Sequence, residues 1–160
     1  DVYKRQVKAS LKKTIQGAVS SVYMKAYQKH ITLSVNEFRD EEIIQDPRWT
    51  QEALVNVLDN AVKYSAPDSA IDIRVDPMVS YFLIEIEDEG IGIPREERGQ
   101  IFKRFYRGRT SFVQEVDGSG VGLYLTRKIL EEQGGSICVK KGKKGSIFQI
   151  TFPKTQYKTC

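Results

Sequence analysis

The chain has 160 residues, of which 40% are hydrophobic and 29% are charged, a size and composition typical of one globular domain. Its net charge of +4 is too mild for the dense basic face of a nucleic-acid-binding protein, so we expect no nucleic-acid partner. The most apolar stretch, residues 81–86, is strand-sized and contains Glu85, which argues against a membrane-spanning segment and against membrane contact by this domain.

The few cysteines and the single histidine limit the kinds of metal, disulfide and catalytic site that the chain can form. Cys138 and Cys160 have neither metal-site spacing nor a disulfide-rich context, so a reducing cytoplasm fits them. His30 is the single histidine, which excludes a site that needs two. No signal peptide is visible and the chain begins at Asp1 rather than Met, so we expect a piece of a longer protein.

Hydrophobic periodicity predicts the first elements. Residues 7–10 are predicted as a short strand, and residues 11–29 as a helix because apolar side chains recur there at helical spacing. Residues 31–37 alternate apolar and polar side chains, which is typical of a half-buried strand. A further strand is predicted at residues 43–45.

A second helix is predicted from residue 47 to about residue 64. Asp46 is a suitable N-cap, and Pro47 suits the first helical position. The apolar stripe of this helix consists of Ala53, Leu54, Val57, Leu58, Ala61 and Val62. Two strands are predicted after it, at residues 70–76 and 81–88.

Residues 94–119 are rich in glycine and charge, with one short helical piece predicted near residues 100–105. A segment of this length is more than a connector, so we expect a lid or a binding loop. A third helix is predicted at residues 121–133, where two glycines stop it. Strands at residues 136–140 and 146–152 then flank a Gly-Lys-Lys-Gly turn.

This order of elements mixes helices with adjacent pairs of strands. It predicts an α/β (α+β) two-layer sandwich, in which three helices cover one face of a mixed sheet. We expect residues 7–153 to form this domain, residues 1–6 to be a linker or expression remnant, and residues 154–160 to be a C-terminal tail.

A polar face on the second helix is the first candidate site. Asn56, Asn60 and Lys63 lie at i, i+4 and i+7, roughly opposite the apolar stripe. Mg²⁺ prefers oxygen ligands and takes few from protein when phosphates supply the rest, so the oxygen of Asn60 is enough. Lys63, one turn later, can meet a phosphate as a point charge. A solvated outer face is the alternative, and this motif alone favours it.

A second candidate ends an apolar strand, where Asp88 precedes Gly90 and Gly92. The glycines allow a tight turn and the close approach of a ligand. A carboxylate just before them can accept a hydrogen bond from an exocyclic amine such as that of adenine. The alternative is an ordinary tight turn with Asp88 as the turn-forming residue.

A third candidate, Gly118, Gly120 and Gly122, opens the third helix, whose N-terminus offers free N–H groups to a phosphate. Its spacing fits neither the dinucleotide-binding pattern nor the P-loop. Between the glycine-rich blocks, Arg104 and Arg107 lie among aromatic residues and can face a triphosphate. A solvated basic loop, or a surface that docks a partner, is the alternative for these arginines.

The four blocks occur in one order: Asn-x-x-x-Asn-Ala-x-Lys-Tyr, Asp-x-Gly-x-Gly-Ile-Pro, Ile-Phe-x-Arg-Phe-Tyr-Arg and Gly-x-Gly-x-Gly-Leu. Together they closely resemble the catalytic ATP-binding domain of sensor histidine kinases, within the gyrase, Hsp90, histidine kinase and MutL superfamily. The resemblance covers residues 7–153. It implies a Bergerat-type fold with an ATP lid, and it implies ATP and Mg²⁺ as cofactors.

The resemblance also implies roles for single residues. Asn60 holds Mg²⁺ with Asn56 beside it, Lys63 contacts phosphate, Tyr64 borders the nucleotide, and Asp88 accepts from the adenine amine. The other implied site residues are Gly90, Gly92 and Ile93 in the adenine pocket; Gly118, Gly120 and Gly122 at the phosphate-side hinge of the lid, with Leu123 behind them; and, as weaker choices, Ser146, Arg104 and Arg107.

The resemblance further implies a phosphoryl donor rather than a dedicated ATPase. ATPases of the superfamily carry a glutamate one turn before the metal asparagine, and here Asn56, a poor general base, takes that place. Glu52 lies two turns before Asn60, too far for the role. We expect transfer of the γ-phosphoryl group of ATP to a histidine on a separate dimerisation and phosphoacceptor domain, and then to the receiver domain of a response regulator.

His30 does not resemble a phosphoacceptor motif, so we expect it to be a structural or surface residue. The isolated chain is then expected to be a monomer that binds nucleotide without phosphorylating itself, from the cytoplasmic portion of a membrane-anchored receptor. Two alternatives stay open: a weak ATPase of the same superfamily and an anti-sigma-type serine or threonine kinase. A non-catalytic binding module would need a broken site, and none of the four motifs is broken.

Overall fold

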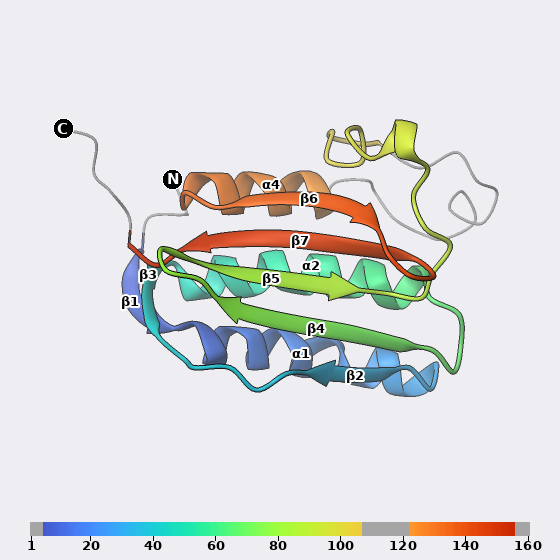
Figure 1. Cartoon of the computed structure of the whole chain (residues 1–160), viewed down its shortest axis with the longest axis horizontal. Helices are drawn as coiled ribbons and strands as arrows, with labels where there is room; N and C mark the ends of the chain where they lie inside the picture. The colour runs from blue at the N-terminus through green and yellow to red at the C-terminus, as the bar shows by residue number, and fades with distance from the viewer. Residues whose placement is uncertain (1–4, 107–121, 156–160) are drawn as a thin grey trace.

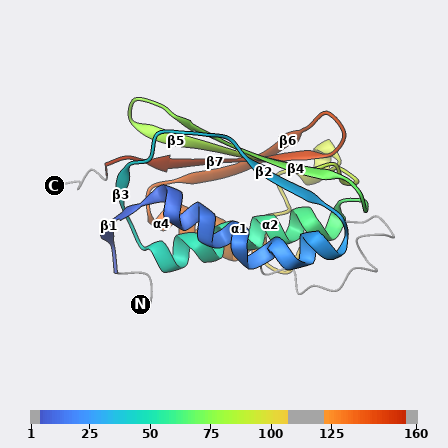
Figure 2. The same ribbon diagram turned by 90° about the horizontal axis from the view of Figure 1, so that it is seen from below.

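The computed structural model describes residues 5–106 and 122–155, which form two layers (Figure 1). One layer is a mixed five-stranded sheet with the strand order β2-β4-β5-β7-β6, and the helices cover one of its faces (Figure 2). The predicted sandwich is therefore confirmed. The elements are β1 (Val7–Ser10), α1 (Leu11–Gln28), β2 (Thr32–Val35), β3 (Glu42–Gln45), α2 (Pro47–Tyr64), β4 (Ala70–Pro77), β5 (Tyr81–Glu87), the 3₁₀ turn η1 (Arg95–Glu97), α4 (Gly122–Glu132), β6 (Ser136–Lys141) and β7 (Ser146–Pro153).

Local capping sets where the helices begin and end. The side chain of Ser10 accepts a hydrogen bond from the N–H of Lys13 at 3.1 Å, which caps α1. Asp46 caps α2 in the same way, through the N–H of Trp49 at 3.3 Å, as the sequence predicted. After α4, Gly134 adopts a φ of +81°, a left-handed conformation that ends a helix and favours glycine.

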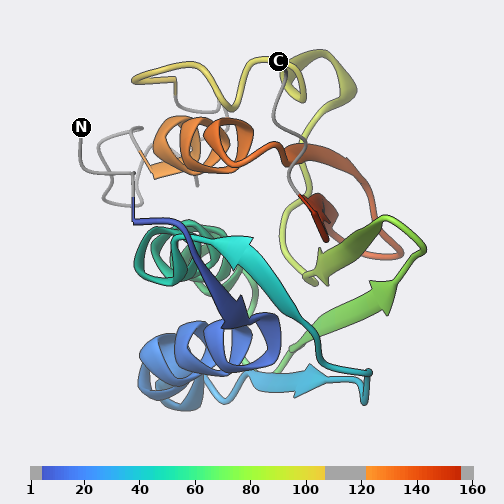
Figure 3. The same ribbon diagram turned by 90° about the vertical axis from the view of Figure 1, so that its left-hand side faces the viewer.

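The core lies between the sheet and the row of three helices, a division that the end-on view in Figure 3 shows. Alternate side chains of β4, β5 and β7 face this layer because the side-chain period of a strand is two. The buried residues of these strands are Ile71, Ile73 and Val75, then Phe82, Ile84 and Ile86, and then Phe148, Ile150 and Phe152. The opposite face of the sheet carries mostly polar and charged side chains, such as Arg74, Glu85 and Gln149.

Strands β1 and β3 form a separate antiparallel pair, with Val7 opposite Gln45. The amide of the fully buried Gln45 donates to the carbonyl of Ala9 at 3.1 Å. At the same corner, Oε1 of Gln133 accepts from the backbone N–H of Asp46 at 2.7 Å, which ties the end of α4 to the start of α2. Periodicity predicted both strands but not this pairing, because the paired residues are far apart in the sequence.

Two predicted boundaries were wrong. The strand predicted at residues 31–37 stops at Val35 because the side chain of Asn36 replaces the backbone ladder, accepting from the N–H of Val75 at 2.7 Å and donating to its carbonyl at 3.1 Å. Residues 100–105, predicted as a short helical piece, form turns instead, and the 3₁₀ turn lies earlier, at Arg95–Glu97. Phe105 has a φ of +64°, which a right-handed helix excludes.

In the described parts of the chain, residues 5–106 and 122–155, we find no helix with the length and apolar character that crossing a bilayer requires.

Lys29 caps the C-terminal end of α2 from the neighbouring helix. Its Nζ donates to the carbonyls of Val62 at 2.7 Å, Lys63 at 3.2 Å and Ser65 at 2.8 Å. These carbonyls have no partner within α2, and a cation there also complements the negative end of the helix dipole. Lys29 therefore holds the end of the helix that carries the predicted phosphate-contacting residues.

The substitution Lys29→Met is expected to lower the free energy of unfolding by about 1–2 kcal/mol, because it removes three charge-assisted hydrogen bonds. Urea denaturation measures this change. Lys25→Met is the matched control one turn earlier, in α1, since Lys25 pairs with Asp59 at the surface, at 3.3 Å. We expect a change within about 0.5 kcal/mol for the control. Equal losses in both variants would show that the capping contacts contribute nothing specific.

Candidate functional site

The described elements that carry the predicted site residues meet at one end of the sandwich, at the right in Figure 1. There the C-terminal end of α2, the start of α4, the end of β5 and the turn between β6 and β7 come together. The isolated bridge between Ser65 and Gly90 joins the end of α2 to the loop after β5. Segments far apart in the sequence thus contribute to one region.

Asp88 lies at the centre of this region. It follows Ile86 by two residues, so strand alternation places it on the helix-covered face, just past the core. Its Oδ1 accepts from the backbone N–H groups of Gly90 at 2.9 Å and Ser146 at 3.1 Å, and its own N–H donates to the carbonyl of Ser146 at 2.9 Å. Asp88 is 6% exposed. The backbone on either side, at Gly90 and at Ser146, fixes the orientation of its side chain.

The second oxygen of this carboxylate has a different environment. Oδ2 of Asp88 makes no hydrogen bond with any residue in the described part of the chain. Among the described residues, Ser65 Oγ alone is a fully buried side-chain oxygen or nitrogen without a hydrogen-bond partner. Since Oδ2 of Asp88 has no partner either, it must be partly exposed to solvent. One oxygen is thus held by backbone and the other is left for a donor from outside, such as an exocyclic amine.

Burial raises the pKa of Asp88 above its usual range, because a charge is disfavoured where water is excluded. The hydrogen bonds from Gly90 and Ser146 act in the opposite direction, and the nearby charge of Glu87 adds to the rise. A buried carboxylate with a raised pKa, beside a region lined by backbone, is typical of a functional site.

Two glycines bring backbone segments into direct contact around Asp88. A Cβ on Gly90 would lie 2.6 Å from the carbonyl oxygen of Tyr64, and a Cβ on Gly145 would lie 2.3 Å from Oδ1 of Asp88. Neither position has room for a side chain. Gly92 has a φ of +76°, which other residues rarely adopt. The site is therefore shaped by main chain, as the predicted roles of Gly90 and Gly92 require.

The polar face of α2 is only partly exposed. Asn56 and Asn60 are half-buried, and Nδ2 of Asn56 donates to the carbonyl of Gly122 at the start of α4, at 3.3 Å. Neither Asn60 nor the exposed Lys63 forms a side-chain hydrogen bond with another described residue. An amide oxygen and an ammonium group are therefore available at the same end of the molecule as Asp88.

These residues fit a metal only if a ligand supplies further oxygens. The described residues contain no group of three or more His, Cys, Asp or Glu side chains that could hold an ion. Asn60 offers one neutral oxygen, which suits Mg²⁺ that keeps water and phosphate oxygens around it. A site made by protein alone, in contrast, would need several carboxylates.

The other predicted site residues have mixed surroundings. Ile93 and Leu123 are partly buried against the core. Ser146 contributes through its backbone, while its hydroxyl makes no hydrogen bond with a described residue. The guanidinium of Arg104 stacks on Phe105 at 4.9 Å and on Tyr124 at 5.8 Å. Arg107, Gly118 and Gly120 lie outside the described residues.

Sequence reasoning missed the supporting residues. Lys29 fixes the end of α2, Gly145 packs against Asp88, and Glu87 and Glu89 contact the turn before β7. The glycines at both ends of the Gly-Lys-Lys-Gly turn were the only available signal. His30 is at the surface as expected, with its side chain 76% exposed and 3.5 Å from Asp68.

The substitution Asp88→Asn is expected to leave the free energy of unfolding at pH 7 unchanged or to raise it by up to about 1 kcal/mol. The carboxamide oxygen can still accept from Gly90 and Ser146, but no charge is buried. Since the folded-state pKa of Asp88 is raised above 3.8, the folded parent binds more protons than the unfolded chain between pH 3.8 and that raised value. The parent therefore gains stability as the pH falls through this window, and the advantage of the variant shrinks.

Urea denaturation of both proteins from pH 7 to pH 4 tests this, with Asp76→Asn as the control at an exposed position of β4. A stability difference between Asp88→Asn and the parent that is the same at every pH would contradict the prediction.

Known proteins share both the sequence pattern and the fold. The profile of the family described as histidine kinase-, DNA gyrase B- and HSP90-like ATPase matches residues 45–156. The signal transduction histidine-protein kinase ArlS of Staphylococcus aureus is 38% identical over 112 residues, which are 69% of this chain and 25% of ArlS. The chain spans 15% to 25% of the length of the first curated relatives it matches.

Among solved structures, the mycobacterial sensor histidine kinase MprB superposes with a TM-score of 0.80 at 26% identity, over 94% of this chain and 100% of that chain. The histidine kinase ThkA, in complex with the response regulator protein TrrA, has a TM-score of 0.74 over 94% of this chain and 42% of that chain. Its 22% identity shows a shared fold alone. The resemblance inferred from the four motifs is confirmed: the chain belongs to the histidine kinase-, DNA gyrase B- and HSP90-like ATPase family.

Proposed function

We propose that residues 7–153 bind Mg-ATP and act as the phosphoryl donor domain of a two-component sensor histidine kinase. The observation that carries this proposal is the divided role of Asp88, with one oxygen held by backbone N–H groups and the other left for a donor. A carboxylate oxygen that is fixed but unpaired selects a ligand with an N–H at that point. The amino group of adenine has this property.

Different residues around Asp88 would contact different parts of the nucleotide. Gly90, Gly92, Ile93 and Ser146 would line the adenine pocket, and Tyr64 would border it. Asn60 would contribute one oxygen to Mg²⁺, and Lys63 would meet a phosphate as a mobile charge. The glycines Gly118, Gly120 and Gly122 would form the hinge of the lid with Leu123 behind it, and Arg104 and Arg107 are the weaker candidates for phosphate contacts.

These residues would position the phosphates of ATP and neutralise their charge, and this chain would supply no general base. Asn56 stands where an ATPase of the superfamily would carry its glutamate, and its amide donates to the carbonyl of Gly122. A carboxamide in this position cannot activate water. ATP held by such a site is therefore kept for an external acceptor, and in-line geometry supplies most of the rate acceleration once that acceptor arrives.

The acceptor would be a histidine on a dimerisation and phosphoacceptor domain of the same parent protein. His30 does not suit that role, because its sequence context does not resemble a phosphoacceptor motif; it lies at the surface between α1 and β2, 3.5 Å from Asp68. The ThkA complex shows that a histidine kinase with this fold assembles with a response regulator, which supports a receiver domain as the next partner. We propose that the parent works in the cytoplasm, as part of a membrane-anchored receptor.

Calorimetric titration of the chain with ADP, with and without Mg²⁺, tests the proposal. We expect a dissociation constant of roughly micromolar size, tighter with Mg²⁺. Asp88→Asn should weaken binding by about tenfold or more because the second oxygen then becomes an amide group that repels the adenine amine. Asp76→Asn is the matched control and should bind as the parent does. Absence of binding in the parent would contradict the proposal and would favour a scaffold that kept the motifs without the ligand.

Incubation with radiolabelled ATP separates the phosphoryl donor from the alternatives. We expect no stable phosphohistidine on the chain and little release of phosphate. Mg²⁺-dependent phosphate release that falls in Asn56→Ala or Glu52→Gln variants would instead identify a weak ATPase. Transfer to a serine or threonine of a protein partner would identify a kinase of the anti-sigma type.

A further inference from the structure

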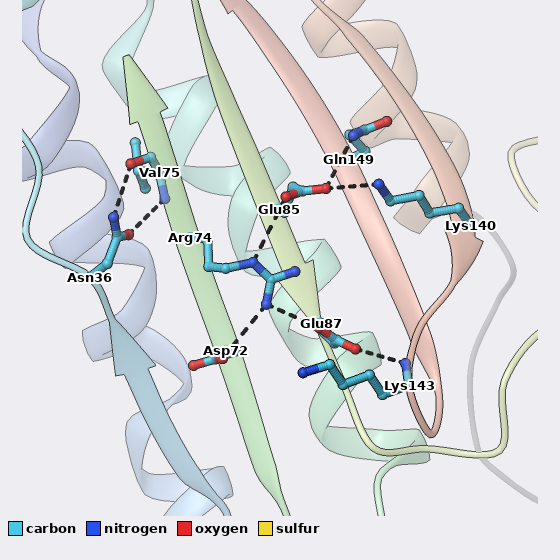
Figure 4. Close-up of polar contacts among 9 residues, drawn as sticks. All are labelled: Asn36, Asp72, Arg74, Val75, Glu85, Glu87, Lys140, Lys143 and Gln149. Atoms are coloured by element: carbon cyan, nitrogen blue, oxygen red, sulfur yellow. Dashed lines mark hydrogen bonds and ion pairs between the residues drawn. The ribbon is translucent and has the colours of Figure 1, made fainter. Parts of the chain in front are cut away.

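The turn of residues 142–145, which lies against Asp88, is held from the open face of the sheet. Oε2 of Glu87 accepts a hydrogen bond from the backbone N–H of Lys143 at 2.9 Å (Figure 4). The other oxygen of Glu87 accepts from Nη1 of Arg74 on β4 at 3.0 Å. The side chain of Glu87 is only 14% exposed, so solvent screens these contacts less than it screens a surface pair.

Glu89 contacts the same turn in a more exposed position. Its Oε2 forms an ion pair with Nζ of Lys144 at 3.0 Å, and the side chain of Lys144 is 75% exposed. Its Oε1 accepts from the backbone N–H of Ala70 at 2.7 Å. The exposed pair is weak by comparison, because solvent and salt screen it. Glu87, with a backbone donor and a half-buried arginine, is the stronger anchor of the turn.

The turn of residues 142–145 connects the Glu87 contact tightly to the Asp88 contact. Gly145, its last residue, has no room for a Cβ beside Asp88, and Ser146 directly after it donates its N–H to Oδ1 of Asp88 at 3.1 Å. Lys143 and Ser146 are three residues apart, within one hairpin. A displacement at the N–H that Glu87 holds is therefore transmitted to the N–H that orients Asp88.

We propose that Glu87 is a positioning residue for nucleotide recognition, which fixes the turn of residues 142–145 so that Asp88 presents one oxygen to the adenine amine. Glu87 itself does not touch the nucleotide, because it lies on the open face of the sheet. It acts through Lys143 and Ser146. This inference rests on the proposed function and adds a residue that the four motifs do not include.

Glu85 provides a matched comparison on the same strand and the same face (Figure 4). It pairs with Arg74 at 3.8 Å and with Lys140 at 3.1 Å, and it accepts from Gln149 at 3.1 Å. None of these partners belongs to the turn. If the open-face network acts only by stabilising the sheet, Glu85→Ala and Glu87→Ala should have similar effects. If Glu87 positions Asp88, only Glu87→Ala should change the recognition of the base.

The experiment compares the affinities for ADP and for inosine diphosphate, which lacks the amino group, in the parent and in Glu87→Ala, Glu87→Gln and Glu85→Ala. Glu87→Ala should weaken ADP binding by about five- to twentyfold and reduce the preference for ADP over inosine diphosphate. Glu87→Gln should restore most of the affinity because its carboxamide oxygen can still accept from Lys143. Glu85→Ala should behave as the parent does.

Amide hydrogen exchange, measured without nucleotide, provides a second readout. The N–H groups of Lys143 and Ser146 should exchange at least about tenfold faster in Glu87→Ala than in Glu85→Ala. The inference is overturned if Glu87→Ala keeps the parent's preference for ADP, or loses affinity for both nucleotides equally, or leaves both exchange rates unchanged. If the parent binds no ADP, the proposed function fails, and exchange at Ser146 still decides whether Glu87 holds the Asp88 contact.

Discussion

The buried carboxylate of Asp88 sets the conditions that the rest of the site has to meet. A charge removed from water is tolerated only where hydrogen bonds replace those it has lost, and here two backbone N–H groups do so. One belongs to Gly90 on the same chain segment, and the other to Ser146 at the start of β7. The register between β5 and β7, in which Glu87 lies opposite Ile147, brings Ser146 to this position. A shift of one residue would leave the carboxylate without its second donor.

The same end of the molecule is built by backbone contacts that allow no side chain. The Ser65–Gly90 bridge joins α2 to the loop after β5, and Gly145 packs directly against Asp88. Such contacts make the walls of a ligand site stiff, because main-chain atoms cannot rotate away as side chains can. Lys29 adds to this by holding the last carbonyls of α2. In the proposed function, recognition of the base would thus depend on residues that do not contact it.

The polar groups on the open face of the sheet are paired with one another, whereas those at the end of α2 are not. On the open face, Arg74 lies within ion-pair distance of Asp72, Glu85 and Glu87, and these groups satisfy one another (Figure 4). On the helix side, Asn60 and Lys63 have no side-chain hydrogen bond with any described residue. Paired charges stabilise a surface weakly, whereas groups without partners at the end of a helix are free to bind a ligand. The contrast supports the assignment of phosphate and metal to α2 and not to the sheet.

The sequence by itself determined the elements and the residue types of the site. Apolar periodicity, the Asp46–Pro47 start of α2 and the glycines after α4 are local signals, and the structure confirmed them. The motifs also predicted Asp88, Asn60 and Gly90 as site residues, because carboxylates, carboxamides and glycines at fixed spacing indicate particular chemistry without coordinates. Local reasoning failed where a distant partner intervenes. The strand of residues 31–37 was predicted too long because Asn36 pairs with Val75, which no pattern within that segment reveals.

Only the tertiary structure decided which residues support the site. The sequence analysis assigned no role to Glu87 or Glu89, and it placed Gly145 only at the end of a Gly-Lys-Lys-Gly turn. Their roles arise from the β6–β7 hairpin lying against the end of β5, a contact between segments more than fifty residues apart, such as Glu87 and Lys143, which are separated by 56 positions. A contact of this kind depends on strand order and register, and these are set by burial of the whole core rather than by any local run of residues.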